Sequence, residues 1–145
     1  MVKSQFVMEF VKKILIDKSK NTYVQFFRYG FVATVSLAVD FGLLVYLKEV
    51  DKVNYLLAAT ISFTFGLITN YLLSVLWVFH SSKLVSKKHE VLIFGLIGLV
   101  GLGITDLILW VLTSGFGVYY VLSKIVATSI VYFWNFGARK KYIFN

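Results

Sequence analysis

The chain has 145 residues, of which 59% are hydrophobic and 18% aromatic, and its mean hydropathy is +0.80. Fifteen Lys and Arg residues outweigh seven Asp and Glu residues, which gives a net charge of +8, and the chain contains neither proline nor cysteine. This composition excludes a soluble globular domain, and the lack of cysteine excludes a disulfide scaffold and cysteine-based metal or thiol chemistry.

Residues 1–22 precede the first apolar segment and are predicted to be a cytoplasmic, amphipathic N-terminal segment. Phe6, Phe10 and Ile14 recur every four residues, a spacing typical of a helix that lies in the membrane interface. The alternative is a cytoplasmic tail without a stable helix. A secretory signal is not predicted, because charged residues interrupt the apolar run and no cleavage site follows it.

Four apolar segments follow, each close to the length of about 20 residues that a membrane-spanning helix needs. The second segment has no charged residue, and the others are broken only by single charges. The sequence therefore predicts an all-α polytopic membrane protein, in which residues 23–145 form a four-helix transmembrane domain. The predicted spans are residues 26–47, 54–79, 91–113 and 119–138.

The second half of the sequence echoes the first half. Asn70 returns as Asn135 and Asp40 returns as Asp106, at nearly the same shift along the chain. Each copy contains two predicted spans, so both copies enter the membrane from the same side, and we expect two tandem parallel repeats related by an axis along the membrane normal. The two copies are residues 26–79 and 91–144.

Lys and Arg are distributed unevenly between the connecting segments, and such positive charges mark the cytoplasmic side of a membrane protein. They gather before the first span, between the second and third spans, and after the fourth span. Both termini are therefore predicted to be cytoplasmic, and the positive charge is expected to meet anionic lipid rather than nucleic acid. The basic residues concerned are Lys3, Lys12, Lys13, Lys18, Lys20, Arg28, Lys83, Lys87, Lys88, Arg139, Lys140 and Lys141.

Ionisable side chains inside the spans are the main candidates for function, because an unpaired charge in hydrocarbon costs several kcal/mol. Asp40 and Asp106 occupy the outer halves of their spans, and Lys124 lies near the outer end of the fourth span. One interpretation is an ion pair between Lys124 and an aspartate that fixes helix register. The other is a binding site, in which Lys124 holds a phosphate while the aspartates take sugar hydroxyls or exchange a proton.

Asn70 and Asn135 lie toward the cytoplasmic halves of the second and fourth spans. They either bridge helices by hydrogen bonds or line a polar path. No catalytic constellation is evident, since His80 and His89 have only Glu90 close in sequence and lack the spacing of metal ligands. The sequence therefore predicts neither an enzyme nor a cofactor or metal site.

Several motifs occur in a defined order: Phe27-Arg28-Tyr29-Gly30 opens the first span, Asn70-Tyr71 and Trp77-Val78-Phe79 close the second, and Lys124-Ile125, Trp134-Asn135-Phe136 and Arg139-Lys140 lie in the fourth. In this order and spacing they resemble the GtrA-like family of small four-helix membrane proteins, over about residues 23–144. The resemblance implies translocation of a polyprenyl-phosphate-linked monosaccharide across the bacterial cytoplasmic membrane. A separate glycosyltransferase would then pass the sugar to O-antigen, teichoic acid or another wall polymer.

The resulting hypothesis places a phosphate contact at the cytoplasmic side, a path of amides in the middle and a headgroup site nearer the outside. Some members of the family carry a basic residue near the start of the third helix, where this chain has Phe94-Gly95. The expected substrate-binding residues are Arg28, Asp40, Asn70, Asp106, Lys124, Asn135 and Arg139.

The expected partners are the lipid-linked sugar, membrane lipid, a glycosyltransferase and a second copy of the chain, because four helices hardly enclose a wide cavity. Two other functions fit parts of the pattern. One is a scaffold that positions a polyprenyl-phosphate glycosyltransferase without transporting anything. The other is a small proton-coupled exporter that uses Asp40 or Asp106 as its proton-binding carboxylate.

Overall fold

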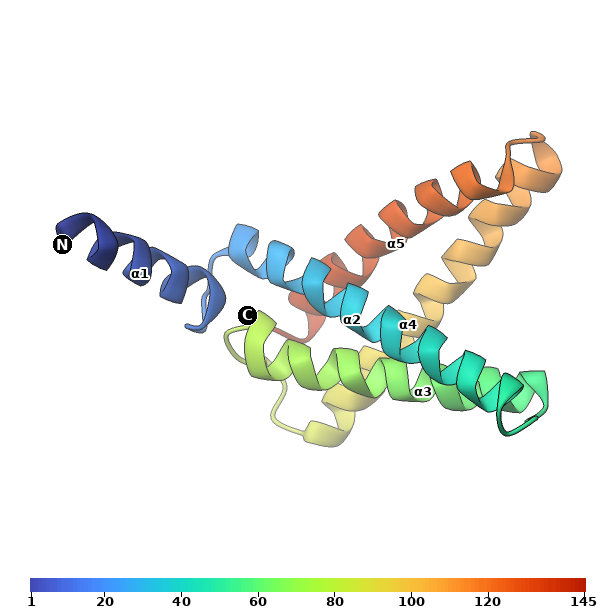
Figure 1. Ribbon diagram of the computed structural model, residues 1–145, viewed down its shortest axis with the longest axis horizontal. Coiled ribbons are helices and arrows are strands. Elements are labelled where there is room, and N and C mark those ends of the chain that lie inside the picture. Colours follow the sequence, from blue (N-terminus) through green and yellow to red (C-terminus); the bar gives the residue numbers. More distant parts are fainter. The chain divides into compact units, whose positions relative to one another are not determined.

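The computed structural model describes residues 1–145, apart from the side chain of Tyr120. The described chain is helical throughout its regular structure, with one isolated β-bridge between Ser82 and Phe144 (Figure 1). This confirms the predicted all-α fold. In chain order, the α-helices and the two π-helical segments are α1 (Val2–Leu15), α2 (Thr22–Glu49), α3 (Tyr55–Leu73), η1 (Ser74–Val78), α4 (Lys87–Leu109), η2 (Trp110–Gly115) and α5 (Tyr120–Tyr142).

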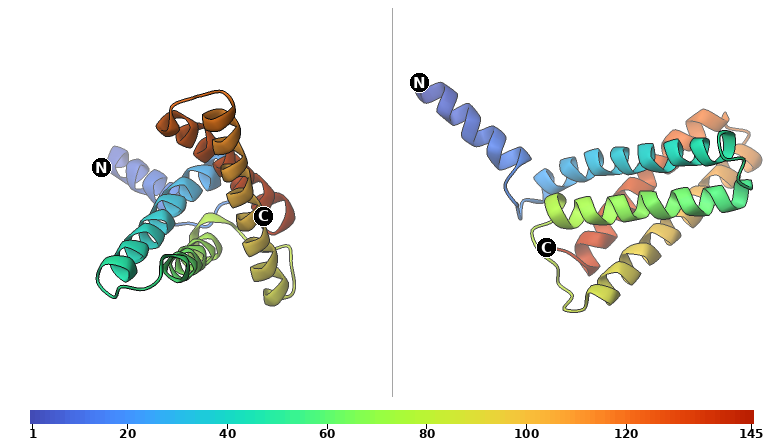
Figure 2. Two further views of the ribbon diagram at one scale, coloured as in Figure 1. Left: turned by 90° about the vertical axis from the view of Figure 1, so that its right-hand side faces the viewer. Right: turned by 60° about the horizontal axis from the view of Figure 1, so that its bottom comes forward.

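The chain divides into two compact units, Met1–Ser81 and Ser82–Asn145. In the first unit, α2 and α3 lie side by side and run in opposite directions, with α1 preceding them (Figures 1 and 2). The second unit is built in the same manner from α4, which continues into η2, and α5. Each unit therefore contains one antiparallel helix pair.

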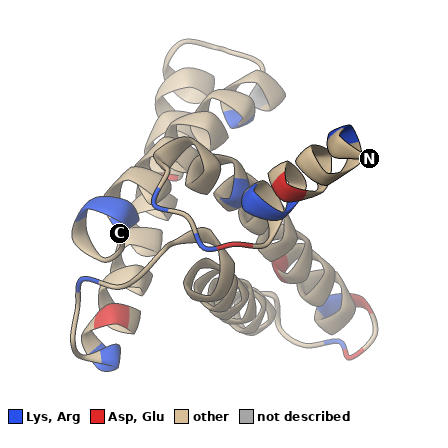
Figure 3. Cartoon of the chain, turned by 90° about the vertical axis from the view of Figure 1, so that its left-hand side faces the viewer, with Lys and Arg blue, Asp and Glu red and all other residues tan. Residues whose placement is uncertain are grey.

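Four helical stretches are long and apolar enough to cross a membrane, which confirms the four predicted apolar helices. At most 22% of the apolar window in any of them is buried within the chain, so most of this apolar surface is left for lipid. Charged residues lie mainly near helix ends and in connecting segments (Figure 3). The four stretches are Thr22–Glu49, Tyr55–Val78, Lys87–Gly115 and Val121–Tyr142.

The helix ends differ from the predicted ends by up to four residues, because capping and charged residues extend the helices beyond their apolar runs. The first span begins at Thr22 rather than at 26, since the side chain of Asn21 accepts hydrogen bonds from the amides of Tyr23 and Val24. The fourth span continues to Tyr142 rather than 138. Its last turn is rich in Lys and Arg, and such charges favour the negative end of the helix dipole.

Small residues line the contact between the helices of each pair. In the first unit α3 buries Ala58, Ser62 and Gly66, which lie four residues apart on one face. In the second unit α5 buries Ser123 and Ala127, also four residues apart. Such stripes allow two helix backbones to approach closely in a membrane, where van der Waals packing replaces the hydrophobic effect as the force that holds helices together.

The two ends of the second unit are tied together next to the β-bridge. The amide of Lys83 donates to the carbonyl of Ile143 at 2.6 Å, and Lys83 Nζ donates to the carbonyl of Lys141 at 2.9 Å. Ile143 and Phe144 are buried, at 0% and 1% exposure. The segment before α4 therefore closes the end of α5 and satisfies carbonyls that the helix leaves without partners.

Candidate functional site

Lys124 and Asp106 lie at the same end of the second unit, where α4 and η2 lead through a short connection into α5. Both residues are exposed, and they form no ion pair with each other in the described part of the chain. The interpretation of these two residues as a buried pair that fixes helix register therefore does not describe this unit. A cationic and an anionic side chain instead remain accessible within two apolar helices.

Asp40 lies at the crossing of α2 and α3 in the first unit. A Cβ atom added to Gly66 would lie 2.9 Å from the Cβ atom of Asp40 and 3.1 Å from the carbonyl oxygen of Ser36. The glycine thus allows the backbone of α3 to pass directly beside Asp40. The carboxylate is half-buried, and no described residue donates a hydrogen bond to it.

Asn70 and Asn135 are both half-buried, and their side-chain oxygens have different surroundings. Asn70 Oδ1 accepts a hydrogen bond from Ser74 Oγ at 3.1 Å, one turn farther along the same helical stretch. Asn135 Oδ1 is buried without a hydrogen-bond partner among the described residues, and it lies 2.9 Å from the position that a Cβ atom would take on Gly101. Neither oxygen makes the interhelical hydrogen bond that was considered for it.

Arg28 lies two turns into α2 and is 3% exposed. Its Nε donates to the carbonyl of Ile14 at 2.6 Å, and Nη2 donates to the carbonyl of Lys13 at 3.1 Å. Nη1 donates to the carbonyl of Trp77 at 2.9 Å, and the guanidinium carbon lies 5.4 Å from the centre of the Trp77 ring. The guanidinium therefore joins α2 to the end of α1 and to η1, rather than projecting toward solvent.

Arg139 has the corresponding role in the second unit and is 1% exposed. Its Nη2 donates to the carbonyl of Phe94 at 3.2 Å, and its guanidinium carbon lies 3.6 Å from the centre of the Phe94 ring. A cation over an aromatic face is attracted by the ring quadrupole, more strongly where water is excluded. Both predicted phosphate-contacting arginines are thus engaged within their own units.

Glu90 is a buried acidic residue that is not among the predicted site residues. It lies in the first turn of α4 and is 0% exposed, and its Oε2 is 3.2 Å from Nζ of Lys87, which is 73% exposed. A carboxylate in the first turn of a helix is stabilised by the positive end of the helix dipole. This position, with a lysine three residues before it, is the sequence signal that could have identified Glu90.

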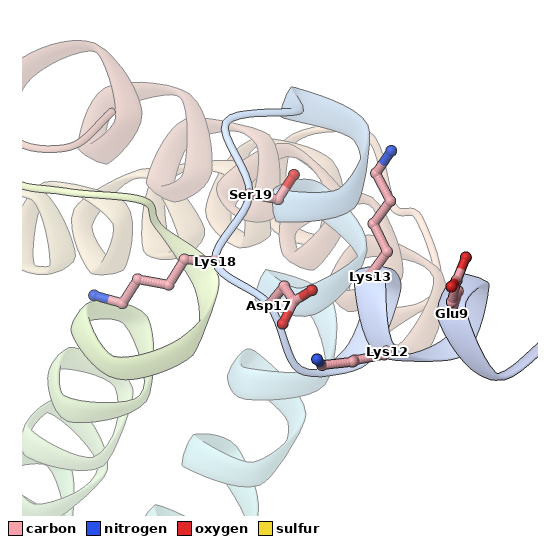
Figure 4. A pocket seen from close by; sticks show the side chains of 6 residues that line it. All are labelled: Glu9, Lys12, Lys13, Asp17, Lys18 and Ser19. Atoms are coloured by element: carbon pink, nitrogen blue, oxygen red, sulfur yellow. The ribbon is translucent and has the colours of Figure 1, made fainter.

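A shallow hollow of about 390 Å³ lies at the end of α1 and the turn that follows it (Figure 4). Its charged lining comes from the N-terminal segment and includes none of the seven predicted site residues. Among the described residues, no cluster of His, Asp and Glu is arranged to hold a metal ion. The lining residues of the hollow are Glu9, Lys12, Lys13, Asp17, Lys18 and Ser19.

The model of the GtrA/DPMS transmembrane domain matches residues 28–144 of the chain. The match includes all seven predicted site residues and leaves α1 outside it. Comparison with curated proteins finds no match. Because the match covers well over half of the chain and the described helices include four apolar spans, the chain is a multi-pass membrane protein.

Proposed function

Since the chain belongs to the GtrA/DPMS transmembrane-domain family, which is associated with lipid-linked sugars, we propose that it moves a polyprenyl-phosphate-linked monosaccharide across the bacterial cytoplasmic membrane. The sugar would then serve the glycosylation of a wall polymer such as teichoic acid or an O-antigen-like polysaccharide. This role makes and breaks no bond. The transfer of the sugar is left to a separate glycosyltransferase, so the chain acts as a transporter and not as an enzyme.

The physical task in this proposal is to shelter a phosphate and a hydroxyl-rich sugar from hydrocarbon. An isolated phosphate in a medium of low dielectric constant costs tens of kcal/mol in the idealised limit, whereas the polyprenyl tail can stay in lipid throughout. A short polar surface on the protein is therefore sufficient. A wide enclosed cavity is not needed.

The observation that carries the proposal is the accessibility of Lys124 and Asp106 within apolar helices. Neither residue is neutralised by the other, although an uncompensated charge in a membrane is costly. A lipid-linked sugar supplies partners for both: an anionic phosphate for the ammonium group and hydroxyls for the carboxylate. These two side chains form the proposed outer headgroup site.

The other predicted residues divide into two groups in the proposal. In the first unit Asn70 is assigned to the polar path, and Asp40, whose carboxylate receives no hydrogen bond from a described residue, is assigned to the headgroup. In the second unit Asn135, whose Oδ1 is buried without a hydrogen-bond partner among the described residues, is assigned to the polar path of that unit. The two arginines already donate to backbone carbonyls. We propose that the two arginines mainly hold the helix pairs together. Phosphate binding at the cytoplasmic side would then depend on other basic side chains there.

The proposal includes a topology in which both termini are cytoplasmic and the two helix pairs are parallel repeats. The distribution of Lys and Arg supports this orientation. A second copy of the chain would extend the polar surface available to one headgroup. Single-cysteine variants of this cysteine-free chain, labelled from one side of the membrane with an impermeant maleimide, would test the orientation directly.

The decisive experiment is reconstitution of the purified chain with a defined polyprenyl-phosphate sugar, followed by measuring how much sugar is accessible from each leaflet to an impermeant reagent. We expect the wild-type chain to equilibrate the two leaflets and Lys124→Ala to abolish equilibration while still inserting normally. Lys48→Ala, which removes an exposed lysine in the last turn of α2 and outside the proposed headgroup site, is the matched control and should retain transport.

The outcomes separate the proposal from its rivals. Wild-type rates for Lys124→Ala would remove this residue from the mechanism. A different pair of results would identify a scaffold for the glycosyltransferase. The wild-type chain would fail to equilibrate the sugar in vesicles, and its deletion in cells would still abolish glycosylation of the polymer. Proton-driven efflux of a lipophilic cation by the same vesicles would identify an exporter.

A further inference from the structure

The N-terminal helix α1 lies outside the family match and has an apolar face, from Phe6 to Leu15, that the first unit does not cover. None of its residues is buried, and Phe6 and Phe10 are 70% and 56% exposed. At 100° per residue these two rings share one face with Ile14, whereas Gln5 and Lys12 lie on the opposite face. Such a helix is suited to the boundary between headgroups and acyl chains.

The C-terminal end of α1 is held by two residues of the membrane-spanning pair. Arg28 donates to the carbonyls of Lys13 and Ile14, and the indole nitrogen of Trp77 donates to the carbonyl of Leu15. These carbonyls belong to the last turn of α1 and have no partner within the helix. We name Arg28 and Trp77 the α1 clamp.

The clamp also fixes the level of α1 relative to the spans of its own unit. Tryptophan is enriched where one end of its ring is wet and the other is apolar, which is the headgroup level of a membrane. Trp77 lies in η1 at the end of the span Tyr55–Val78, and its ring packs edge-on against Phe31 of α2 at 5.7 Å between ring centres. A helix attached at this point therefore lies at the membrane surface.

The charge around α1 complements an anionic leaflet. Lysines outnumber acidic residues in the first 20 positions by five to two, and three of these lysines line the hollow at the end of α1 (Figure 4). Lys18 Nζ reaches the carbonyl of Val75 in η1, at 3.4 Å, which places its charge at the same helix end as the clamp. Clustered lysines beside a spanning helix attract anionic headgroups.

We propose that α1 is an interfacial anchor that binds the anionic lipid of one leaflet through its lysines and apolar face, with its C-terminal end fixed by the α1 clamp. The partner is the bulk leaflet surface and not the transported lipid. The proposal does not depend on sugar transport.

The test uses the full chain, which has no cysteine and therefore accepts a single environment-sensitive fluorophore at a chosen position. Phe10→Cys places the label on the apolar face, and Gln5→Cys places it on the polar face as the matched control. In phosphatidylcholine vesicles that contain phosphatidylglycerol, brominated acyl chains should quench the label at position 10 several-fold more than the label at position 5. This contrast should shrink without phosphatidylglycerol and in the double variant Lys12→Gln/Lys13→Gln.

Equal quenching at the two positions, or a contrast that ignores lipid charge, would overturn the anchor. Energy transfer between labels at position 10 on two chains, in place of quenching by lipid, would show that a second copy covers the apolar face and would also overturn it.

The clamp has its own test. Trp77→Phe keeps an aromatic ring but removes the donor to Leu15, and should speed hydrogen exchange of the amides of residues 16–21 in the reconstituted chain. Trp134→Phe is the matched control, because it removes an indole donor that binds Ile97 in the second unit. Equal exchange in the two variants would overturn the assignment of the clamp.

Discussion

The two helix pairs each enclose a buried arginine but take it from opposite helices. In the first pair Arg28 of α2 donates to the carbonyl of Trp77 in η1, whereas in the second pair Arg139 of α5 donates to the carbonyl of Phe94 in α4. In the repeat predicted from the sequence, Arg139 corresponds to Ser74, and Phe94 corresponds to Arg28. The cation has therefore moved to the other helix of the pair, while the link between the two helices is kept.

The glycine at each helix crossing also comes from opposite helices in the two pairs. In the first pair Gly66 of α3 approaches Asp40 of α2, and in the second pair Gly101 of α4 approaches Val131 and Asn135 of α5. Val131 corresponds to Gly66 in the repeat predicted from the sequence. A close crossing requires a small residue on only one of the two helices, so either helix can supply it. The contact between the two helices is therefore kept in both pairs, although different residues supply it.

The largest loss of stability is expected when the arginine of the first pair is removed. Arg28→Ala leaves carbonyls of α1 and η1 without a charged donor, and we expect it to lower the free energy of unfolding by about 3 kcal/mol. Arg28→Lys keeps the charge but not the planar fork, and should recover only part of this loss. The measurement is the midpoint of unfolding by SDS in mixed micelles. A wild-type midpoint for Arg28→Ala would contradict the structural role.

The next largest effect concerns the crossing of the first pair. Gly66→Ala places a Cβ atom 2.9 Å from the Cβ atom of Asp40 and 3.1 Å from a backbone oxygen, and neither atom can move without shifting α2. We expect a loss of about 2 kcal/mol in the free energy of unfolding, measured in the same micelles. An unchanged midpoint would show that the two helices are farther apart than in this structure.

The crossing of the second pair should tolerate the same change better, which sharpens the comparison. The nearest atom to the new Cβ in Gly101→Ala is Asn135 Oδ1, at the end of a side chain that can rotate away. We expect a loss of about 1 kcal/mol. In a double-mutant cycle, part of this loss should disappear in the background of Asn135→Ala. Strict additivity of the two substitutions would contradict the contact.

The smallest effect is expected at glycines that lie away from both crossings. No atom lies within 4 Å of a Cβ atom added to Gly42 or Gly103, although both glycines are in spanning helices. Alanine at either position should be neutral or stabilising by up to about 1 kcal/mol, because it restricts the unfolded chain and favours the helix. A loss as large as that of Gly66→Ala would reveal a contact outside those described.

The number of apolar helices, their approximate limits and the family were predictable without any coordinates. These properties follow from the hydropathy, spacing and identity of residues within short windows, such as the uncharged run through the second span. The spacing of Ala58, Ser62 and Gly66, which the structure buries on one face of α3, follows the helical period, since residues four apart share one helix face. Orientation of the termini stays a prediction from the positions of Lys and Arg.

The contacts of the polar side chains in each unit depend on how its helices pack. Arg28 and Arg139 donate to carbonyls 49 and 45 residues away in sequence. From the sequence, an arginine that donates to backbone carbonyls cannot be distinguished from one that binds a phosphate. The burial of Glu90 and the accessibility of Lys124 likewise depend on which helix face meets its partner. Hydropathy assigns a residue to a span, but packing between helices decides whether its charge is covered or left for a ligand.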